Sequence, residues 1–353
     1  MNDKIRENAG FVSNAMLVSL VISRWYNTIT DQEITDTLAV NHKAKKFAIS
    51  VRKQLLAKRG AVIKVQAALT ALRSYHNAMT LPWSKGIGII KSSKYTEYSA
   101  KIRQLITEVN IAVQDLVKEF PALKTDAKDN LLGDLYKDSD YPDVLNLKDK
   151  FNIKVDVVPV PKKGDWRIDL VGEELDKLDQ ALEEREKERT AAAMKALWER
   201  LYNPVKHMVE VLGKDNPKIY NTLITNISNL TEILPDLNIL DDPELNKLGT
   251  EIEEKLCDSS IEELRKSPMR KKELHESAES LKQKIKKKGK IQDDNNKNDS
   301  SKDDSSKDDN SNDDAMAMMS GYANSDQEKQ DKVINEFGRP VTGQRKIKMG
   351  KKK

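Results

Sequence analysis

The sequence predicts a mainly α protein, a multi-helix bundle with one long helical hairpin, a small two- or three-stranded β-sheet and a disordered C-terminal tail. Apolar residues recur every three or four positions in most segments between residues 61 and 260, which is typical of amphipathic helices. They alternate in only a few short segments and thin out beyond residue 267. Aromatic residues make up 5% of the chain, so much of the core must consist of Leu, Ile, Val and Ala.

Residues 61–120 form the predicted helical hairpin. Two faces with this helical spacing are expected to bury each other. Residues 76–90 are the expected corner between the two helices, with Pro82 stopping the first helix and Pro121 ending the second. The apolar stripe of the first arm is Val62, Val65, Leu69, Leu72 and Met79, and that of the second is Ile102, Leu105, Ile106, Val109, Val113, Leu116, Val117 and Phe120.

Three elements are expected before the hairpin. Residues 16–25 are rich in β-branched side chains and are expected to form a buried strand, with a short buried helix as the alternative. A helix is expected from residue 31, capped by Thr30 or Asp31, and another over 43–57, capped by Asn41. Gly60 is the expected break before the hairpin. The apolar face of the 43–57 helix would consist of Phe47, Val51 and Leu55.

Beyond Pro121, the pattern predicts a helix over 122–136 and a turn over 138–143. Apolar residues alternate in 151–160 and again in 166–171, so these segments are expected to form a β-hairpin beside 16–25. A long charged helix is expected over 173–202, and Pro204 either kinks it or starts a new helix. Helices over 216–234 and 244–256 complete the pattern, the latter capped by Asp242 and Pro243.

The chain divides into five predicted regions. They are a loose N-terminus (1–15), a helical domain with the small sheet (16–265), a basic helix or linker (266–290), an acidic low-complexity tail (291–330) and a short basic element (331–353). The motif SSKDD occurs twice in succession within 300–309. A segment of this composition buries too little apolar surface to offset chain entropy, so the tail is expected to be disordered.

The net charge of +4 conceals a strong asymmetry. Residues 43–103 contain fourteen Lys and Arg residues against one acidic residue, Glu97, a net charge of +13, so the rest of the chain sums to −9. Segregated positive charge indicates a polyanionic partner more strongly than the overall charge does.

Nucleic acid is the predicted partner, because cations that neutralise phosphates release counterions and aromatic rings stack on bases. Tyr75, Trp83, Tyr95 and Tyr98 are interleaved with the cations. The alternative is that the cations form a solvated face, attracted within the chain to the acidic helix 173–199, and that the aromatic residues belong to the core. The predicted nucleic-acid-binding residues are Lys45, Lys46, Arg52, Lys53, Lys58, Arg59, Lys64, Arg73, Lys85, Lys91, Lys94, Trp83 and Tyr95.

No pattern in the sequence indicates an enzyme. The run KGIG at 85–88 lacks the spacing of a phosphate-binding loop and is expected to be a plain corner. Four scattered histidines, of which His76 and His207 are expected to be partly buried, indicate no zinc site. Asp138, Asp140 and Asp143 are more typical of a turn than of a magnesium site. Neither a cofactor nor a metal is expected.

Cellular location follows from cysteine content and hydropathy. Cys257 is the single cysteine, which excludes an internal disulfide and fits a reducing compartment. The most apolar early run, 11–22, is too short to span a bilayer, and no secretory signal precedes it. We therefore expect a cytoplasmic protein with no membrane partner and a structural role for Cys257.

Several short motifs occur in a characteristic order. They are LVSLVISRW at 17–25, YH at 75–76, TLPW at 80–83, YTEY at 95–98, DYP at 140–142, VPVP at 158–161, DWR at 165–167, LWERLY at 197–202 and LPDLN at 234–238. In this order the chain resembles an uncharacterised domain family of tailed phages and integrative elements. The resemblance covers roughly residues 17–257 and does not extend into the tail.

The resemblance implies a phage or mobile-element protein in the cytoplasm of the host cell, often encoded near recombination genes and a MoxR-like AAA ATPase similar to a cobalt-chelatase subunit. It supplies no catalytic residues. The resulting hypothesis is a non-enzymatic accessory protein of DNA metabolism or recombination that binds nucleic acid through a basic helical face. The alternatives are an adaptor or assembly protein for the AAA ATPase or another phage protein, and, more weakly, a structural protein of the virion.

Overall fold

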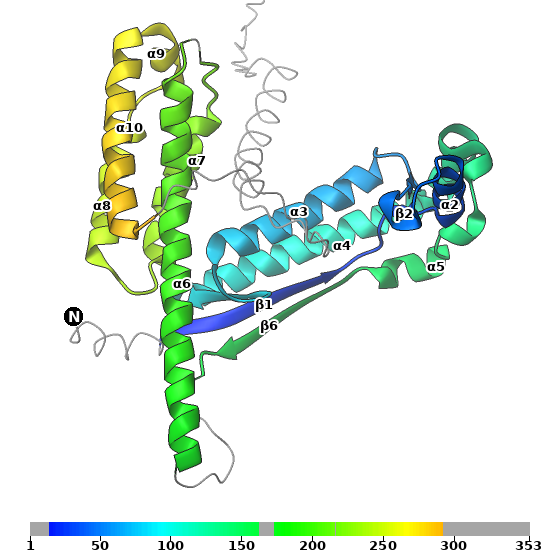
Figure 1. Cartoon of the computed structure of the whole chain (residues 1–353), viewed down its shortest axis with the longest axis horizontal. Coiled ribbons are helices and arrows are strands. Elements are labelled where there is room, and N and C mark those ends of the chain that lie inside the picture. The colour runs from blue at the N-terminus through cyan, green and yellow to red at the C-terminus, as the bar shows by residue number, and fades with distance from the viewer. Residues whose placement is uncertain (1–13, 162–172, 216, 292–353) are drawn as a thin grey trace, which may run out of the picture.

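The protein is mainly α-helical, with small antiparallel sheets, as the sequence predicts. The computed structural model describes residues 14–161, 173–215 and 217–291. The expected strand at 166–171 and the regions 291–330 and 331–353 lie outside these residues, apart from residue 291. In Figure 1, the long helix α6 (Glu173–Leu212) runs beside a group of helices and past the end of an arm that extends to one side.

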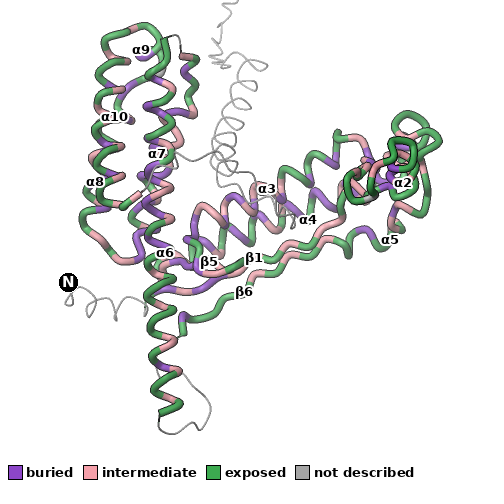
Figure 2. Tube along the Cα trace, viewed as in Figure 1, coloured by how far each residue is buried: buried purple, intermediate pink, exposed green. Residues whose placement is uncertain are grey.

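The predicted helical hairpin forms the body of the arm. It consists of α3 (Ala61–Met79) and α4 (Tyr95–Asp126), and the predicted apolar stripes pack together in one core. Buried residues recur along both helices in Figure 2. Gly60 precedes α3 with a φ of +53°, which confirms the expected break there. Phe120 is fully buried and makes edge-to-face contacts with Trp25 and Tyr141. The hairpin is therefore anchored at its far end by aromatic packing.

A four-stranded antiparallel sheet lies against the hairpin, and its strand order is β4-β5-β1-β6. Strand β1 (Ala15–Ser23) confirms the strand predicted at 16–25 and pairs with β6 (Asn152–Pro159) and with β5 (Ile87–Lys91). Strand β4 (Leu81–Ser84) completes the sheet beside β5. Val18 packs into the core of the arm, whereas its neighbour Leu17 packs against the core that contains α6.

The corner predicted at 76–90 is a β-hairpin, formed by β4 and β5, rather than a simple turn between helices. Gly86 occupies the turn with a φ of +74°, and Gly88 lets Thr80 approach so closely that an added Cβ would lie 2.7 Å from the Thr80 side chain. The β-branched run Ile87, Ile89 and Ile90 favours a strand once β1 offers its edge. The KGIG run therefore belongs to a strand turn.

The helix predicted over 43–57 is wrong. The chain forms α2 (Gln32–Asn41), capped by Asp31, then a single 3₁₀ turn (Lys46–Ala48) and strand β3 (Arg52–Gln54), which pairs with β2 (Thr28–Thr30). The amide of Asp31 donates to Val51 O at 2.9 Å, and Val51 N donates to Thr35 Oγ1 at 3.1 Å. These long-range hydrogen bonds pair the polar groups of Val51 in an extended conformation. Without the predicted helix, Phe47 has no apolar face to join and is 86% exposed.

Among the residues that the structure describes, three prolines lie inside helices, and Pro121 does not end α4 as predicted. Instead α4 continues to Asp126, followed by a π-helical turn (Ala127–Leu132) and Gly133 at a φ of +52°. Pro204 lies within α6 and Pro235 within α7 (Thr222–Leu237). An internal proline costs about 3 kcal/mol or more, and each of these prolines follows or precedes a buried apolar residue, namely Phe120, Val205 and Leu234.

The far end of the arm consists of short elements. After the π-helical turn come 3₁₀ turns at Gly133–Leu135 and Asp138–Asp140 in place of the rest of the predicted 122–136 helix. The short helix α5 (Val144–Leu147) follows, capped by Asp143, and a 3₁₀ turn (Lys148–Lys150) leads into β6. A further 3₁₀ turn (Ser92–Lys94) connects β5 to α4.

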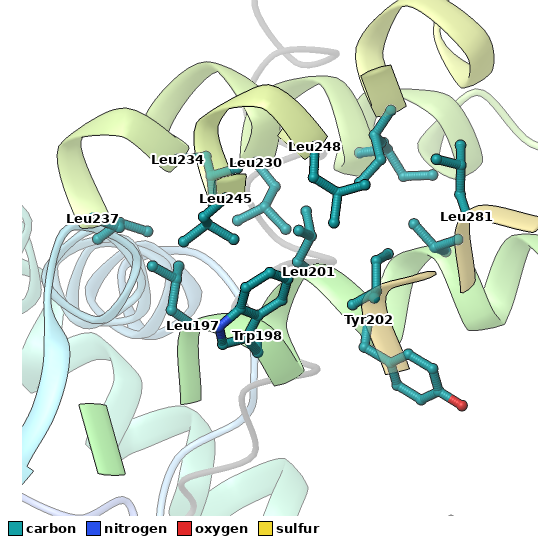
Figure 3. Close-up of a cluster of buried hydrophobic side chains, with 14 of the residues drawn as sticks. Leu197, Trp198, Leu201, Tyr202, Leu230, Leu234, Leu237, Leu245, Leu248 and Leu281 are labelled. Carbon is teal, nitrogen blue, oxygen red and sulfur yellow. The ribbon is translucent and has the colours of Figure 1, made fainter. Parts of the chain in front are cut away.

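The second group of helices, which we call the helical lobe, comprises the C-terminal half of α6 with α7, α8 (Pro243–Leu256), α9 (Ile261–Lys266) and α10 (Pro268–Gly289). Figure 3 shows its core, in which leucines of α7 and α8 meet Trp198 and Leu201 of α6. Asp242 and Pro243 begin α8 as predicted. Helix α10 occupies the segment 266–290 and contributes Leu274, Ala278, Leu281 and Ile285 to this core. None of the described helices has the length and apolar content needed to cross a membrane.

The aromatic anchor of the hairpin can be tested by substitution. Phe120→Ala is expected to lower the free energy of unfolding by about 3–5 kcal/mol, because it leaves a cavity beside Trp25 and Tyr141. The control is Ile111→Ala on the same helix, whose side chain is 55% exposed, and it should change stability by about 0.5 kcal/mol or less. Urea unfolding followed by circular dichroism measures both. Equal effects of the two substitutions would contradict this packing.

Candidate functional site

A hollow of about 550 Å³ lies beside one face of α3, where β1 ends and where β2 and β3 begin. Four cations line it: Arg24 directly after β1, Arg52 at the start of β3, Lys58 in the loop before α3, and Arg73 on α3. We call this hollow the basic cleft. Its lining includes no carboxylate, and none of the four cations forms an ion pair within the described part of the chain.

Aromatic side chains accompany the cations in the basic cleft. Trp25 and Phe151 line it together with Tyr26, whose side chain is 61% exposed. The Arg24 guanidinium lies 4.9 Å from the centroid of the Tyr26 ring, an arrangement typical of cation–π contact. An exposed ring beside unpaired cations offers a stacking surface and charge in the same place.

The walls of the basic cleft are fixed by hydrogen bonds of Asn27, two from its side chain and one from its backbone. The side-chain Nδ2 of Asn27 donates to Leu56 O at 2.7 Å, and its Oδ1 accepts from Leu56 N at 2.6 Å. In addition, Leu55 N donates to the backbone oxygen of Asn27 at 3.0 Å. These bonds join the loop after β1 to the segment that carries Arg52 and Lys58. The cations on both sides of the cleft are therefore held on one rigid unit.

Three of the predicted binding residues, Arg52, Lys58 and Arg73, meet in the basic cleft. Five of the other ten are cations that pair with acids elsewhere. The Nζ atom of Lys53 lies 2.6 Å from Asp140 Oδ2 and 3.3 Å from Asp31 Oδ2, and the residue is only 5% exposed. The remaining pairs are Arg59 with Asp126, Lys64 with Asp115, Lys91 with Asp241, and Lys94 with Asp236 and Glu97.

The other predicted binding residues lie apart from the basic cleft. Lys45 approaches the exposed Phe47 ring at 5.9 Å, Lys46 begins the 3₁₀ turn, and Lys85 is exposed in the β4–β5 turn. Trp83 is buried in the core of the helical lobe, and Tyr95 packs beside Tyr98 at 6.4 Å between ring centroids. The thirteen residues therefore do not share one helical face, because segment 43–57 is not a helix and long-range ion pairs disperse its neighbours.

Sequence reasoning missed Arg24, Trp25 and Tyr26, which precede the basic segment 43–103. The available signal was the run of an arginine and two aromatic residues at the end of the strand predicted over 16–25. Their position beside Arg52 depends on the pairing of β2 with β3, which brings Thr28 opposite Gln54. Local spacing contains no information about this pairing.

The remaining ionisable candidates have structural surroundings. His76 is buried and lies 2.7 Å from Tyr98 Oη, and burial lowers the pKa of His76 to about 4. Burial raises the pKa of the Cys257 thiol to about 11, so the thiol is unreactive at neutral pH. Asp138 and Asp140 pair with Lys124 and Lys53, while Asp143 caps α5. The described residues contain no cluster of His, Cys, Asp or Glu suited to a metal ion.

Comparisons with protein-family models, curated proteins and solved structures find no match for this chain. The resemblance to the phage and mobile-element family therefore stays a prediction, and the candidate site stands on its geometry.

The buried position of Lys53 predicts a structural role. The Ile34 amide and the Lys53 ammonium both lower the pKa of Asp31, which shows that its charged form is stabilised in the folded state. Lys53→Ala removes the cation between two carboxylates and is expected to lower the free energy of unfolding by about 3 kcal/mol. The control is Lys64→Ala, which removes an exposed ion pair with Asp115 (3.7 Å between Nζ and Oδ2) and should have little effect on the free energy of unfolding. Urea unfolding at pH 7 compares them, and an unchanged midpoint for Lys53→Ala would contradict the structural role.

Proposed function

We propose that this protein binds nucleic acid through the basic cleft, as a non-enzymatic accessory protein of DNA metabolism or recombination in a phage or mobile element. The observation that supports the proposal is the set of four cations around one hollow without a neighbouring carboxylate. Elsewhere in the same basic segment, five of the predicted cations have acidic partners. The cleft thus concentrates the positive charge that internal pairing leaves available.

Electrostatics favours an anionic ligand in the basic cleft. Like charges gathered in a hollow repel one another, and a polyanion that lies among them removes this repulsion while releasing its own counterions. Phosphate is a suitable group because the three arginines present planar donors that match its oxygens. A chain of phosphates can engage cations along the whole length of the hollow, whereas a single small anion contacts only those around one point.

The aromatic residues favour nucleic acid over other polyanions. Tyr26 and Trp25 offer ring faces or edges within the same hollow as Arg24 and Arg52. Base–aromatic stacking contributes about 1–3 kcal/mol per base and tolerates any sequence. The arrangement suits binding without strong sequence preference, in keeping with an accessory role.

A salt titration tests phosphate contact. Four phosphate contacts to a single strand predict a slope of about −3 for log K against log salt, and Arg52→Gln/Lys58→Gln should reduce it to about −1.4 and weaken binding at least tenfold. The matched control is Lys101→Gln/Lys118→Gln, which removes the same charge from exposed positions on α4 outside the cleft. Fluorescence anisotropy with a labelled oligothymidylate at 50–300 mM NaCl measures the slopes. Binding that does not respond to salt would rule out the proposal.

A protein partner is the second candidate function, and exposed apolar residues favour it. At the far end of the arm, Val40, Phe47 and Leu145 are 73%, 86% and 85% exposed. Large apolar side chains exposed to this degree are typical of contact surfaces when they gather on one region. They offer a docking surface for the AAA ATPase partner that the resemblance implies.

Co-elution tests this second function. A MoxR-like ATPase from the same phage or element should co-elute with the full chain in size-exclusion chromatography, and Phe47→Ser/Leu145→Ser should abolish co-elution because it removes both apolar contacts. The control Ile63→Ser/Ile111→Ser changes two exposed apolar residues on the body of the hairpin. Co-elution that survives the first pair of substitutions would place the docking surface elsewhere.

A further inference from the structure

The face of α3 that lines the basic cleft continues beyond it. Val62, Val65, Gln66, Leu69 and Arg73 line the cleft at intervals of three or four residues. The same periodicity then reaches His76, Asn77 and Thr80, which line a second hollow of about 340 Å³. Arg73 belongs to both hollows, so the two lie end to end along one face of α3.

The second hollow, which we call the hairpin hollow, lies between α3, the β4–β5 hairpin and α6. Arg200 of α6 and Arg73 line it, and no carboxylate does. Lys85 is exposed in the turn between Ser84 and Gly86, both of which also line the hollow. This end of the α3 face therefore repeats the charge pattern of the basic cleft.

Arg200 has unused hydrogen-bonding capacity. Its Nη1 atom donates to Ala78 O at 3.4 Å, and the residue forms no ion pair with any described residue. Burial lowers the pKa of Arg200 to about 10, so the guanidinium remains charged at neutral pH. A guanidinium has five N–H donors. Four of them are left for an anionic oxygen that enters the hollow.

We propose that the ligand of this protein is a single strand of nucleic acid that lies along α3 from the basic cleft to the hairpin hollow, with Arg200 binding a phosphate at the far end. This inference rests on the proposed function and adds the strandedness and the path of the ligand. A single strand is required because stacking on Tyr26 needs a base whose face is free, and base pairs in a duplex are stacked on each other.

The length of the path sets the size of the binding site. From Val62 to its last residue, Met79, α3 rises about 26 Å at about 1.5 Å per residue. A stacked strand advances about 3.4 Å per nucleotide, so the path accommodates about eight nucleotides. The basic cleft alone, from Val62 to Arg73, spans about 16 Å and accommodates about five.

Binding as a function of oligonucleotide length tests the path. We expect the affinity of the full chain for labelled oligothymidylates of 4 to 12 nucleotides, measured by fluorescence anisotropy, to rise with length up to about eight nucleotides and then level off. Arg200→Gln should level off at about five nucleotides, bind the 4-mer as the wild type does, and bind the 8-mer about tenfold more weakly. Arg200→Lys keeps the charge and should retain most of the gain beyond five nucleotides. An unlabelled duplex of the same length should compete at least tenfold less well than the single strand.

The outcomes separate the two proposals. A wild-type plateau at about five nucleotides, or an Arg200→Gln variant that binds the 8-mer as tightly as the wild type, would overturn the path to the hairpin hollow. The proposed function would still stand if Arg52→Gln/Lys58→Gln weakened binding at every length. Equal competition by duplex would overturn the single-strand assignment. No binding of any oligonucleotide by the wild type would overturn both proposals. Thermal unfolding of Arg200→Gln confirms that its fold is intact.

Discussion

Two hydrophobic cores meet at one sheet, and the arrangement of the whole protein depends on the alternation of side chains along its central strands. Leu17 of β1 and Ile89 of β5 belong to the core of the helical lobe, whereas the next residues, Val18 and Ile90, belong to the core of the arm. Because successive residues of a strand point to opposite faces, the sheet is shared by both cores. A one-residue shift in the pairing of β1 would turn each set of side chains toward the opposite core, where the packing does not fit them.

Ion pairs also connect the arm to the helical lobe, beside the shared sheet. Lys91 at the end of β5 contacts Asp241 and donates to Pro235 O at 3.0 Å, and Lys94 contacts Asp236 at 3.0 Å. These acids lie at the end of α7 and in the connection that leads to α8. The cations nearest the lobe are thus occupied by the lobe itself, while those farther along the arm, around the basic cleft, are not.

The fold could be predicted from the sequence wherever local periodicity and tertiary packing agree. The stripe from Ile102 to Phe120 and the cap formed by Asp242 and Pro243 are such cases. The spacing of Phe47, Val51 and Leu55 predicted a helix, but spacing is only local information. In the structure Val51 accepts a hydrogen bond from Asp31 N and donates one to Thr35 Oγ1, and these bonds fix an extended backbone there. Local propensity is a weak preference that such long-range contacts override.

The candidate site was less predictable than the fold, because charge density along the chain does not distinguish paired cations from unpaired ones. Lys53 and Arg52 are neighbours in sequence, yet one is buried between carboxylates from distant segments and the other lines an open cleft. Arg24 and Arg200 lie far outside the basic segment and reach the same face of α3 through the tertiary structure. Only the three-dimensional arrangement separates the cations that stabilise the fold from those available to a ligand.

The paired hydrogen bonds between Asn27 and Leu56 have a kinetic consequence. Because they hold the loop after β1 in place before any ligand arrives, binding would require little ordering of the chain and lose correspondingly little conformational entropy. A site formed in advance needs no rearrangement after encounter, so its association rate is governed by diffusion and by attraction between opposite charges. The lifetime of the complex would then depend mainly on contacts made inside the cleft, and the speed of its formation on the field outside it.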